Sequence, residues 1–459
     1  MADKKITSIN PSTYETLGEV AYTSEEEIKN IIAKANQARK EWKELGLGGR
    51  VKALRKVSDK LTEKKDELAK LGAQEMGMPI SQSNADVQDG INFFNWYLDN
   101  ASKYLSPEVV YEDNKITQTV YYEPIGTAAV ITPWNFPVSN FVWGAGQNLI
   151  AGNTVIYKTS EECPLFGKLL EETINSAGLP EGVFSEIYGD GTVGDFLTHQ
   201  DINLISFTGS TKVGKYLYQV GGEKFIKVVC ELGGSAPGIV FSDADLDEVI
   251  EVIYGNRFTN CGQMCDALKR LIVHDSIFDK VAERLRKKLE SLKVGNAEDE
   301  STDIGPLVAK RQLELLEEQI QDAVDKGAKV IIGGKRPEGL NGAYYEPTIL
   351  TNVTKEMRVW QEEVFGPVLP IVAFDTDEKS VKMANDTNYG LGSYIYTKDK
   401  EKALKVATQI EAGMVSINTA SYINACSPFG GYKDSGIGRE HGKFGFAELT
   451  QVKVVAIEK

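Results

Sequence analysis

The chain has 459 residues, enough for two or three domains, and a formal net charge of −15 from 51 Lys and Arg against 66 Asp and Glu. This balance counts against nucleic acid as a partner, because binding a polyanion depends on Lys and Arg that neutralise phosphates. The five cysteines, an odd number in a long chain, do not resemble a disulfide framework and favour a cytoplasmic location.

The first hundred residues are predicted to be helical. A capping box runs from Ser24 to Glu27, and apolar residues follow it at helical spacing as far as Trp42. The segment 116–131 then alternates and is rich in β-branched and aromatic side chains, which predicts a hairpin or paired strands. An uncharged run, 124–157, contains prolines and amides that are costly in hydrocarbon, so we expect a buried segment and no membrane contact.

From residue 154 onwards, short apolar runs alternate with helical patterns. The runs predict buried strands at 154–157, 184–188, 204–207 and 227–230, and then at 237–241, 270–274, 329–332 and 368–373. Helices are predicted between them, at 164–177 and 211–219 among others. Such alternation is typical of βαβ units on a parallel sheet, so the expected fold class is α/β. A last predicted strand, 452–457, is too isolated to begin a sheet of its own.

Two motifs directly follow predicted strands. PWNFP (133–137) is either a rigid aromatic turn or a device that directs the Asn135 amide at a developing oxyanion. FTGSTKVG (207–214) opens a helix, and its small residues allow a phosphate to approach the helix N-terminus. A glycine turn before a helix is common, so this second motif alone is weak evidence.

Two further motifs carry ionisable groups. CELGGSAP (230–237) ends a predicted strand with Glu231, which is either a solvated strand end or a base in a cleft. FTNCGQMCD (258–266) holds Cys261 and Cys265, which are core residues, a metal pair, half of a disulfide, or one reactive thiol beside a bystander. None of the three histidines lies at metal-ligand spacing from a cysteine, so we expect no metal site and no histidine chemistry.

Together, these four motifs resemble those of the aldehyde dehydrogenase superfamily, and the resemblance extends from residue 8 to the C-terminus. EEVFGPVL (362–369) and SPFGGYKDSGIGRE (427–440) also match in order and spacing. QEMGMP (74–79) is most similar to the short succinate-semialdehyde dehydrogenases. The N-terminal segment is shorter than in most members, so we expect it to lack their leading hairpin.

The resemblance implies oxidation of an aldehyde to a carboxylic acid on a cysteine. Cys265 matches the nucleophile, which leaves Cys261 as the bystander. Asn135 and the Cys265 backbone N–H would hold the oxyanion of a thiohemiacetal. Hydride transfer to NAD(P)+ would leave a thioester, and Glu231 would activate the water that hydrolyses it.

The resemblance also implies a nicotinamide cofactor, NAD by preference, with NADP as the alternative. Lys158 and Glu161 would contact the adenosine ribose, where a carboxylate accepts hydrogen bonds from hydroxyls but repels a 2′-phosphate. The 209–214 turn would hold the pyrophosphate. The expected cofactor-binding residues are Thr132, Trp134, Lys158, Glu161, Gly209, Ser210, Gly214, Leu232, Glu363 and Phe365.

The substrate tunnel is expected to be lined by Asn140, Trp143, Asp266, Ser427 and Phe429. The polar residues among them favour a small oxygenated aldehyde over a long aliphatic one. Succinate semialdehyde is the candidate that the resemblance suggests, but none of these residues is an arginine that would clamp its carboxylate.

The implied fold has three parts. A Rossmann-type NAD(P)-binding domain would take 1–105 and 125–233, and an α/β catalytic domain would take 234–434. A small β oligomerisation element would join 106–124 to 435–459 and build a homodimer or a homotetramer.

Two other functions share this fold. A CoA-acylating semialdehyde dehydrogenase typically lacks the water-activating glutamate, so Glu231 argues for hydrolysis. A catalytically retired structural or binding protein is expected to lose Cys265 or Asn135, and both are present.

Overall fold

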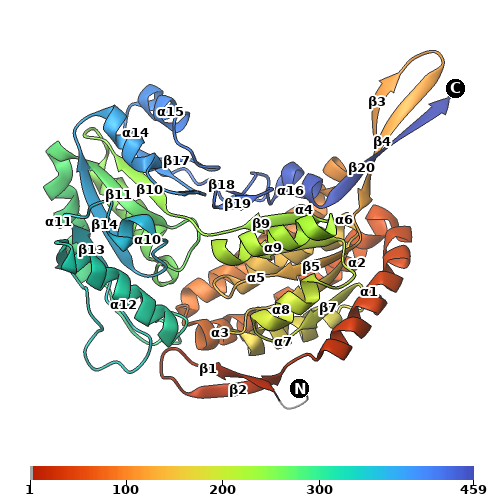
Figure 1. Ribbon diagram of the computed structural model, residues 1–459, viewed down its shortest axis with the longest axis horizontal. Coiled ribbons are helices and arrows are strands. Elements are labelled where there is room, and N and C mark those ends of the chain that lie inside the picture. The colour runs from red at the N-terminus through yellow and green to blue at the C-terminus, as the bar shows by residue number, and fades with distance from the viewer. Residues whose placement is uncertain (1–3) are drawn as a thin grey trace.

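The computed structural model describes residues 4–459, which form two α/β lobes and a projecting β arm (Figure 1). One lobe is built on a six-stranded sheet and the other on a seven-stranded sheet, and we name them the six-stranded lobe and the seven-stranded lobe. The expected α/β fold class is confirmed.

The sheet of the six-stranded lobe has the order β19-β9-β8-β5-β6-β7, and only β19 is antiparallel to its neighbour. Its inner strands are buried along most of their length, as expected for a parallel sheet covered by helices. The strands are β5 (Thr127–Ile131), β6 (Thr154–Lys158), β7 (Phe184–Ile187), β8 (Leu204–Thr208), β9 (Lys227–Glu231) and β19 (Gly436–Ile437). The helical segments between them are α5 (Pro137–Asn140), η1 (Phe141–Gly146), α6 (Gln147–Ala151), α7 (Pro164–Asn175), α8 (Gly191–Thr198) and α9 (Thr211–Lys224).

Helices from both ends of the chain complete this lobe. They are α1 (Glu25–Glu44), α2 (Gly46–Glu63), α3 (Lys65–Met76), α4 (Ile80–Leu105) and α16 (Gly442–Glu448). The predicted capping box is confirmed, because the Ser24 side chain accepts from the Glu27 backbone and Glu27 accepts from the Ser24 backbone. Trp42 is fully buried and donates its indole N–H to the Leu149 carbonyl at 3.1 Å, which ties α1 to α6.

The sheet of the seven-stranded lobe has the order β12-β13-β14-β11-β10-β16-β17, and only β12 is antiparallel. The strands are β10 (Ala236–Val240), β11 (Leu268–His274), β12 (Lys329–Ile332), β13 (Thr348–Thr351), β14 (Val368–Phe374), β16 (Tyr394–Tyr396) and β17 (Ser416–Ile417). The helices are α10 (Leu246–Phe258), η2 (Thr259–Gly262), η3 (Asp275–Ile277), α11 (Phe278–Glu290), α12 (Lys310–Asp325), α13 (Arg358–Gln361), α14 (Asp377–Asn385) and α15 (Lys400–Ala407). A small ladder pairs β15 (Tyr389–Gly390) with β18 (Tyr432–Lys433).

The two lobes meet at the carboxyl end of β9. Only residues 232–235 separate this strand from β10 in the other sheet. The chain then returns from the seven-stranded lobe, and β19 pairs with β9 so that Gly436 lies opposite Glu231. Segments distant in sequence are therefore brought together around Glu231.

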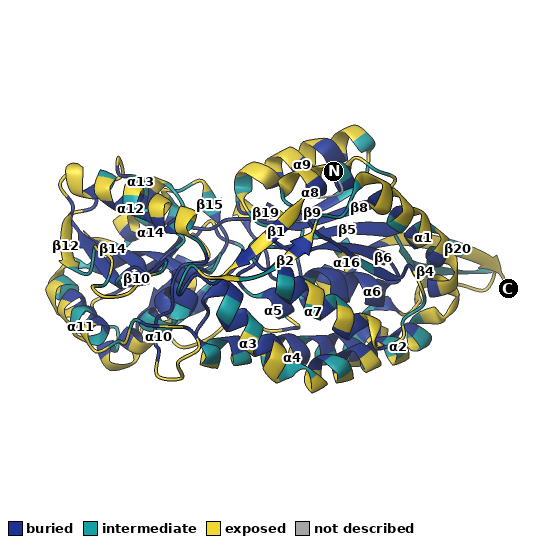
Figure 2. Ribbon diagram, turned by 90° about the horizontal axis from the view of Figure 1, so that it is seen from below, coloured by how far each residue is buried: buried dark blue, intermediate teal, exposed yellow. Residues whose placement is uncertain are grey.

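The projecting arm is a three-stranded sheet. It contains β3 (Glu108–Glu112), β4 (Ile116–Pro124) and β20 (Thr450–Glu458), and β20 pairs with β4 along its whole length. The predicted pairing of the C-terminal strand with the strands before Pro124 is confirmed. Much of the arm is exposed (Figure 2), including the apolar residues Val109, Val110, Val452, Val454 and Ile457.

The expectation for the N-terminus was wrong. Residues before α1 form a hairpin of β1 (Lys5–Ile9) and β2 (Thr16–Ala21), where we expected helices and no leading hairpin. Both strands are short, but each buries one apolar residue, since Ile6 and Val20 pack against Tyr188.

The expectation that 116–131 forms one pair of strands was also wrong. β4 belongs to the arm and β5 to the six-stranded sheet, so the two do not pair. The chain turns between them at Gly126, with φ of 144°, where a Cβ would lie 2.3 Å from Asn203 Oδ1. The uncharged run that begins here is buried in the six-stranded lobe for most of its length, as expected. Within residues 4–459, no helix is both long and apolar enough to cross a membrane.

Candidate active site

The loop that carries Cys265 has an unusual backbone. Asn260, Cys261 and Gly262 all have positive φ, at 50°, 55° and 72°, and such angles are costly for residues other than glycine. The Gln263 side chain spans the loop, because its Nε2 donates to the Asn260 carbonyl at 3.1 Å and its Oε1 accepts from Val308 N at 2.9 Å. The strained turn is therefore fixed from both sides, and Cys265 follows it half-buried.

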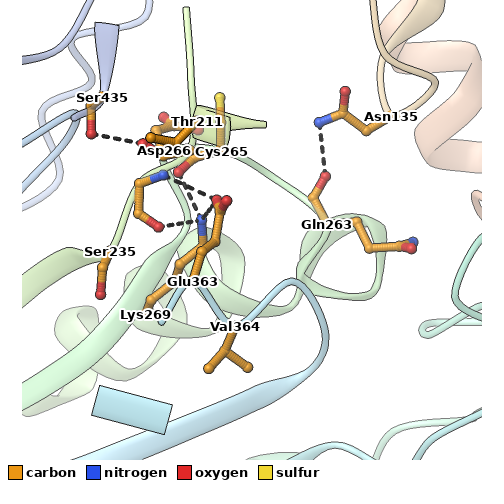
Figure 3. A network of polar contacts seen from close by, with 12 residues as sticks. Asn135, Thr211, Ser235, Gln263, Cys265, Asp266, Lys269, Glu363, Val364 and Ser435 are labelled. Atoms are coloured by element: carbon orange, nitrogen blue, oxygen red, sulfur yellow. Dashed lines mark hydrogen bonds and ion pairs between the residues drawn. The ribbon is translucent and has the colours of Figure 1, made fainter. Parts of the chain in front are cut away.

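The Asn135 amide is fixed by the same loop. Its Nδ2 donates to the Gln263 carbonyl at 3.0 Å, as Figure 3 shows, and Asn260 Nδ2 donates back to the Asn135 carbonyl at 2.9 Å. Asn140 Nδ2 lies 3.3 Å from Asn135 Oδ1. An amide nitrogen carries two hydrogens, and the bond to Gln263 uses one of them. The other is a donor held next to the Cys265 loop.

Lys269 supports the loop that carries Cys265, and the sequence analysis did not predict this role. Its fully buried ammonium donates to the Cys265 and Gly234 carbonyls, both at 2.8 Å, and forms an ion pair with Glu363 (Figure 3). Burial lowers the pKa of Lys269, whereas Glu363 raises it. A lysine inside an apolar run, four residues after a cysteine, was the available signal, because a buried charge requires partners.

The two cysteines of the motif have different surroundings. Cys261 is fully buried in the core of the seven-stranded lobe, where burial raises the pKa of its thiol to about 12. Burial and then Asp266 also raise the pKa of Cys265 well above its usual value, while Lys269 lowers it. Only Cys265 is partly accessible, so only it can meet a substrate.

Glu231 is buried without a partner. Neither of its carboxylate oxygens has a hydrogen-bond partner among residues 4–459. Burial, and then the nearby Glu440, raise the pKa of Glu231 well above its usual value, and burial raises the pKa of Glu440 itself to about 7. A Cβ at Gly430 would lie 2.7 Å from Glu231 Oε1, so the 427–440 motif closes over this carboxyl. Buried polar groups are normally satisfied, which makes Glu231 a candidate for binding water or a ligand.

A pocket of about 570 Å³ opens in the six-stranded lobe beyond the ends of its strands. Predicted cofactor residues that line it are Thr132, Trp134, Lys158, Glu161, Gly209 and Ser210. Its size suits a cofactor, and α9 begins at its wall, with Ser210 Oγ accepting from Val213 N at 3.4 Å. The residues present therefore fit a dinucleotide.

Four other predicted cofactor residues do not line this pocket. A Cβ at Gly214 would lie 2.3 Å from Leu232 Cδ2, so this glycine allows α9 to pack on the strand end. Glu363 is engaged by Lys269 and by Gly234 N at 3.0 Å. Phe365 packs edge-on against Trp134, with ring centroids 5.8 Å apart. Their proposed contacts with a cofactor stay predictions.

The predicted tunnel residues lie around Cys265 to different degrees. Trp143 and Phe429 belong to one apolar cluster with Cys265 and Tyr422. The ring centroids of Trp143 and Phe429 are 5.4 Å apart. Asn140 lies against Asn135. Ser427 is half-buried, and its hydrogen bonds are to Asn424 and Cys426 rather than to the other tunnel residues.

Asp266 has a tyrosine partner that the sequence analysis did not identify. Tyr422 donates its hydroxyl to Asp266 Oδ2 at 3.1 Å, and Tyr394 donates to the Asp266 carbonyl at 2.9 Å. His441 packs against Trp143, one of the predicted tunnel residues, with ring centroids 4.5 Å apart, and burial lowers the pKa of His441 to about 3. The histidine is therefore neutral, and its ring extends the aromatic wall.

Known proteins are similar to this chain over nearly its whole length. A family model described as the Aldehyde dehydrogenase family matches residues 1–455. A glutarate-semialdehyde dehydrogenase of Pseudomonas putida is 38% identical over 450 residues, which are 98% of this chain and 93% of that protein. The NADP(+) succinate-semialdehyde dehydrogenase GabD of Escherichia coli is 36% identical, over 98% of this chain and 93% of its own length.

A solved structure agrees as well. Betaine aldehyde dehydrogenase from Staphylococcus aureus, in complex with NAD+, superposes with a TM-score of 0.95 at 33% identity. The match covers 99% of this chain and 91% of that chain. The chain therefore belongs to the aldehyde dehydrogenase family.

Proposed function

We propose that this protein oxidises a small polar aldehyde to its carboxylic acid with NAD(P)+, through a thioester on Cys265. The observation that carries the proposal is the grouping of an accessible thiol, a fixed amide and an unpaired buried carboxyl whose charge acts on that thiol, at one junction between the lobes. Each has a separate task in acyl chemistry on a cysteine.

In the first step, the Cys265 thiol loses its proton to solvent water, and the thiolate sulfur attacks the aldehyde carbon. A carbon–sulfur bond forms, and the carbonyl electron pair moves to the oxygen. That oxyanion accepts hydrogen bonds from the free Asn135 amide hydrogen and the Cys265 backbone N–H, which stabilise it most where water is excluded. Lys269 favours the thiolate electrostatically and holds the loop through the Cys265 carbonyl.

The bound nicotinamide cofactor supplies the acceptor for the hydride that leaves this carbon, so that a thioester remains on Cys265. Glu231 then takes a proton from water, and the hydroxide attacks the thioester carbon. The carbon–sulfur bond breaks, and Cys265 departs as the thiolate. Burial raises the pKa of Glu231, which makes its carboxylate a stronger base towards water.

The tunnel supports a neutral, oxygen-bearing aldehyde. Asp266 lies next to Cys265 in the chain and, when ionised, would repel an anionic tail, while its bond to Tyr422 leaves acceptor capacity for a substrate hydroxyl. None of the five predicted tunnel residues carries a positive charge. Succinate semialdehyde is the alternative, supported by the names of relatives such as the E. coli enzyme.

NAD is the proposed preferred cofactor because Glu161 lies at the pocket wall near Lys158. A carboxylate there accepts from ribose hydroxyls and repels a 2′-phosphate. We also propose that the arm assembles homodimers or homotetramers, because its exposed apolar residues need a partner surface.

The test is a panel of aldehydes screened by NADH absorbance. Neutral hydroxyaldehydes are expected to give a higher kcat/KM than succinate or glutarate semialdehyde. Absence of NADH with every aldehyde would contradict the proposed activity. A preference for the semialdehydes would contradict only the proposed substrate class.

A further inference from the structure

A second charged pair lies at the Glu161 end of the cofactor pocket and joins the two lobes. Arg311 lies in the first turn of α12, in the seven-stranded lobe, and Glu162 follows β6 in the six-stranded lobe. Both Nε and Nη2 of Arg311 donate to the same oxygen, Glu162 Oε1, at 2.8 and 2.5 Å. The arginine side chain is 57% exposed and the glutamate 19%.

Arg311 lines the pocket beside the two residues expected to contact the adenosine ribose. The wall at this end is formed by Lys158, Ser160 and Glu161 from one lobe and by Arg311 from the other. Lys158 has little freedom, because its buried ammonium donates to the Thr159 carbonyl at 3.0 Å and lies 3.7 Å from Glu161. The guanidinium of Arg311 is far more exposed than the ammonium of Lys158, so it is the less enclosed of the two cations.

Each cation at this end already has a carboxylate partner, and the carboxylate Asp195 also lines the pocket. Two cations, Lys158 and Arg311, face two carboxylates, Glu161 and Glu162. NAD presents neutral hydroxyls here, whereas NADP adds a phosphate that carries nearly two negative charges. Such a phosphate requires a cation that can leave its carboxylate. Arginine suits this task, since its planar fork matches phosphate oxygens and both of its bonds here end on one atom.

We propose that Arg311 is a cofactor-selecting residue: it binds the 2′-phosphate of NADP, and Glu162 competes with that phosphate for it. This inference rests on the proposal that the pocket binds the adenosine half of NAD(P). Selection then depends on two carboxylates with different actions. Glu161 repels the phosphate, and Glu162 occupies the cation that would bind it.

The test uses adenosine ligands, so it needs neither the aldehyde nor turnover. Isothermal titration of the full-length protein compares 2′,5′-ADP, which carries the 2′-phosphate, with 5′-ADP, which lacks it. Glu162→Gln is expected to tighten 2′,5′-ADP about tenfold, the scale of one charge-assisted hydrogen bond, and to leave 5′-ADP nearly unchanged. Arg311→Gln is expected to weaken 2′,5′-ADP by a similar factor, and the double variant to behave like Arg311→Gln.

A matched control is available on the same lobe. Arg336 forms a similar pair with Glu317, at 2.6 Å through both Nε and Nη2, and does not line the pocket. Arg336→Gln should change neither affinity. Arg311→Lys keeps the charge and should retain part of the preference, which gives a second variant if Arg311→Gln folds poorly.

Two results would overturn the inference while leaving the pocket assignment intact. One is an equal change in both affinities, which would indicate a structural tie between lobes. The other is no change in the ratio of affinities in either single variant. If the wild type binds neither ligand, the proposed cofactor site itself fails, and this inference fails with it.

Discussion

Two ionisable side chains are buried beside Cys265, one at the carboxyl end of β9 and one at the start of β11. They differ in whether they have hydrogen-bond partners. Lys269, on β11, has two carbonyls and a carboxylate within reach of its ammonium. Glu231, on β9, has no partner for either oxygen among the described residues. The satisfied group holds the loop in place, whereas the unsatisfied one is available for chemistry.

An unpaired buried carboxyl is not sufficient by itself. Both oxygens of Glu186, on β7, also lack partners within the described chain, and burial raises its pKa as well. It packs against Gly167 on α7, where a Cβ would lie 2.5 Å from its Oε1. Glu231 differs from Glu186 because it also acts electrostatically on the Cys265 thiol.

The largest effect is expected for the nucleophile. Cys265→Ser should lower kcat by about 10⁴-fold or more, because a serine hydroxyl is a far weaker nucleophile at neutral pH. Cys261→Ser is the matched control and should retain most activity, since Cys261 is fully buried. Steady-state NADH production measures both, and comparable losses would reopen a paired role for the two cysteines.

Glu231→Gln tests the role of the buried carboxyl that has no hydrogen-bond partner among the described residues. Thioester formation should persist while hydrolysis slows by about 10²- to 10⁴-fold, the usual contribution of a general base. Rapid mixing should give a burst of NADH close to one per active site and then a slow phase. Glu186→Gln is the control and should show no burst. A first turnover slowed as much as the steady state would contradict the proposed role.

Lys269→Met tests the role of the buried ammonium whose hydrogen bonds are satisfied. Removing the ammonium leaves Glu363 without its buried counter-ion, which should cost on the order of 3 kcal/mol of unfolding free energy. Lys269 lowers the pKa of Cys265, so its loss should raise that pKa and move the pH profile of iodoacetamide alkylation to higher pH. Arg270→Met should destabilise the fold but leave the alkylation profile in place. An unchanged profile in Lys269→Met would leave Lys269 with a purely structural role.

The smallest effect is expected at the pocket rim, where Glu161 is 43% exposed and 3.7 Å from Lys158. Glu161→Ser should shift the NADP/NAD ratio of kcat/KM by about tenfold towards NADP, because it removes like-charge repulsion that solvent already weakens. Glu181→Ser removes another lysine-paired carboxylate, on the surface, and should not shift the ratio. If wild type prefers NADP, the basis for expecting NAD is lost.

Much of the fold and of the candidate site was predictable, because both depend on local patterns. The strands that end at Lys158 and Glu231 are apolar runs, and the motifs that follow them are contiguous. Lys269 had a signal, a charge within a buried strand, but its partners lie on other segments. No sequence signal predicts the pairing of Arg311 with Glu162, because the residues around each give no sign that it contacts the other lobe.

The N-terminal hairpin and the division of 116–131 failed for a related reason. Alternation along a strand predicts that it pairs, but not with which strand. β4 takes its partners from β3 and the C-terminal β20, and β5 takes its partners from β6 and β8. The turn at Gly126 separates these two strands, and it lies against Asn203, which is distant in sequence. Local sequence alone therefore does not predict the turn.

The return of the chain to Glu231 has a consequence for biosynthesis. The residues that close over this carboxyl, Gly430, Gly436 and Glu440, leave the ribosome long after Glu231 itself. A nascent chain can contain Cys265, Asn135 and the whole nucleotide pocket while the end of β9 still faces water. The surroundings of Glu231 are therefore complete only after residues 430–440 have been synthesised, and a chain truncated before residue 430 lacks the segment that closes over this carboxyl.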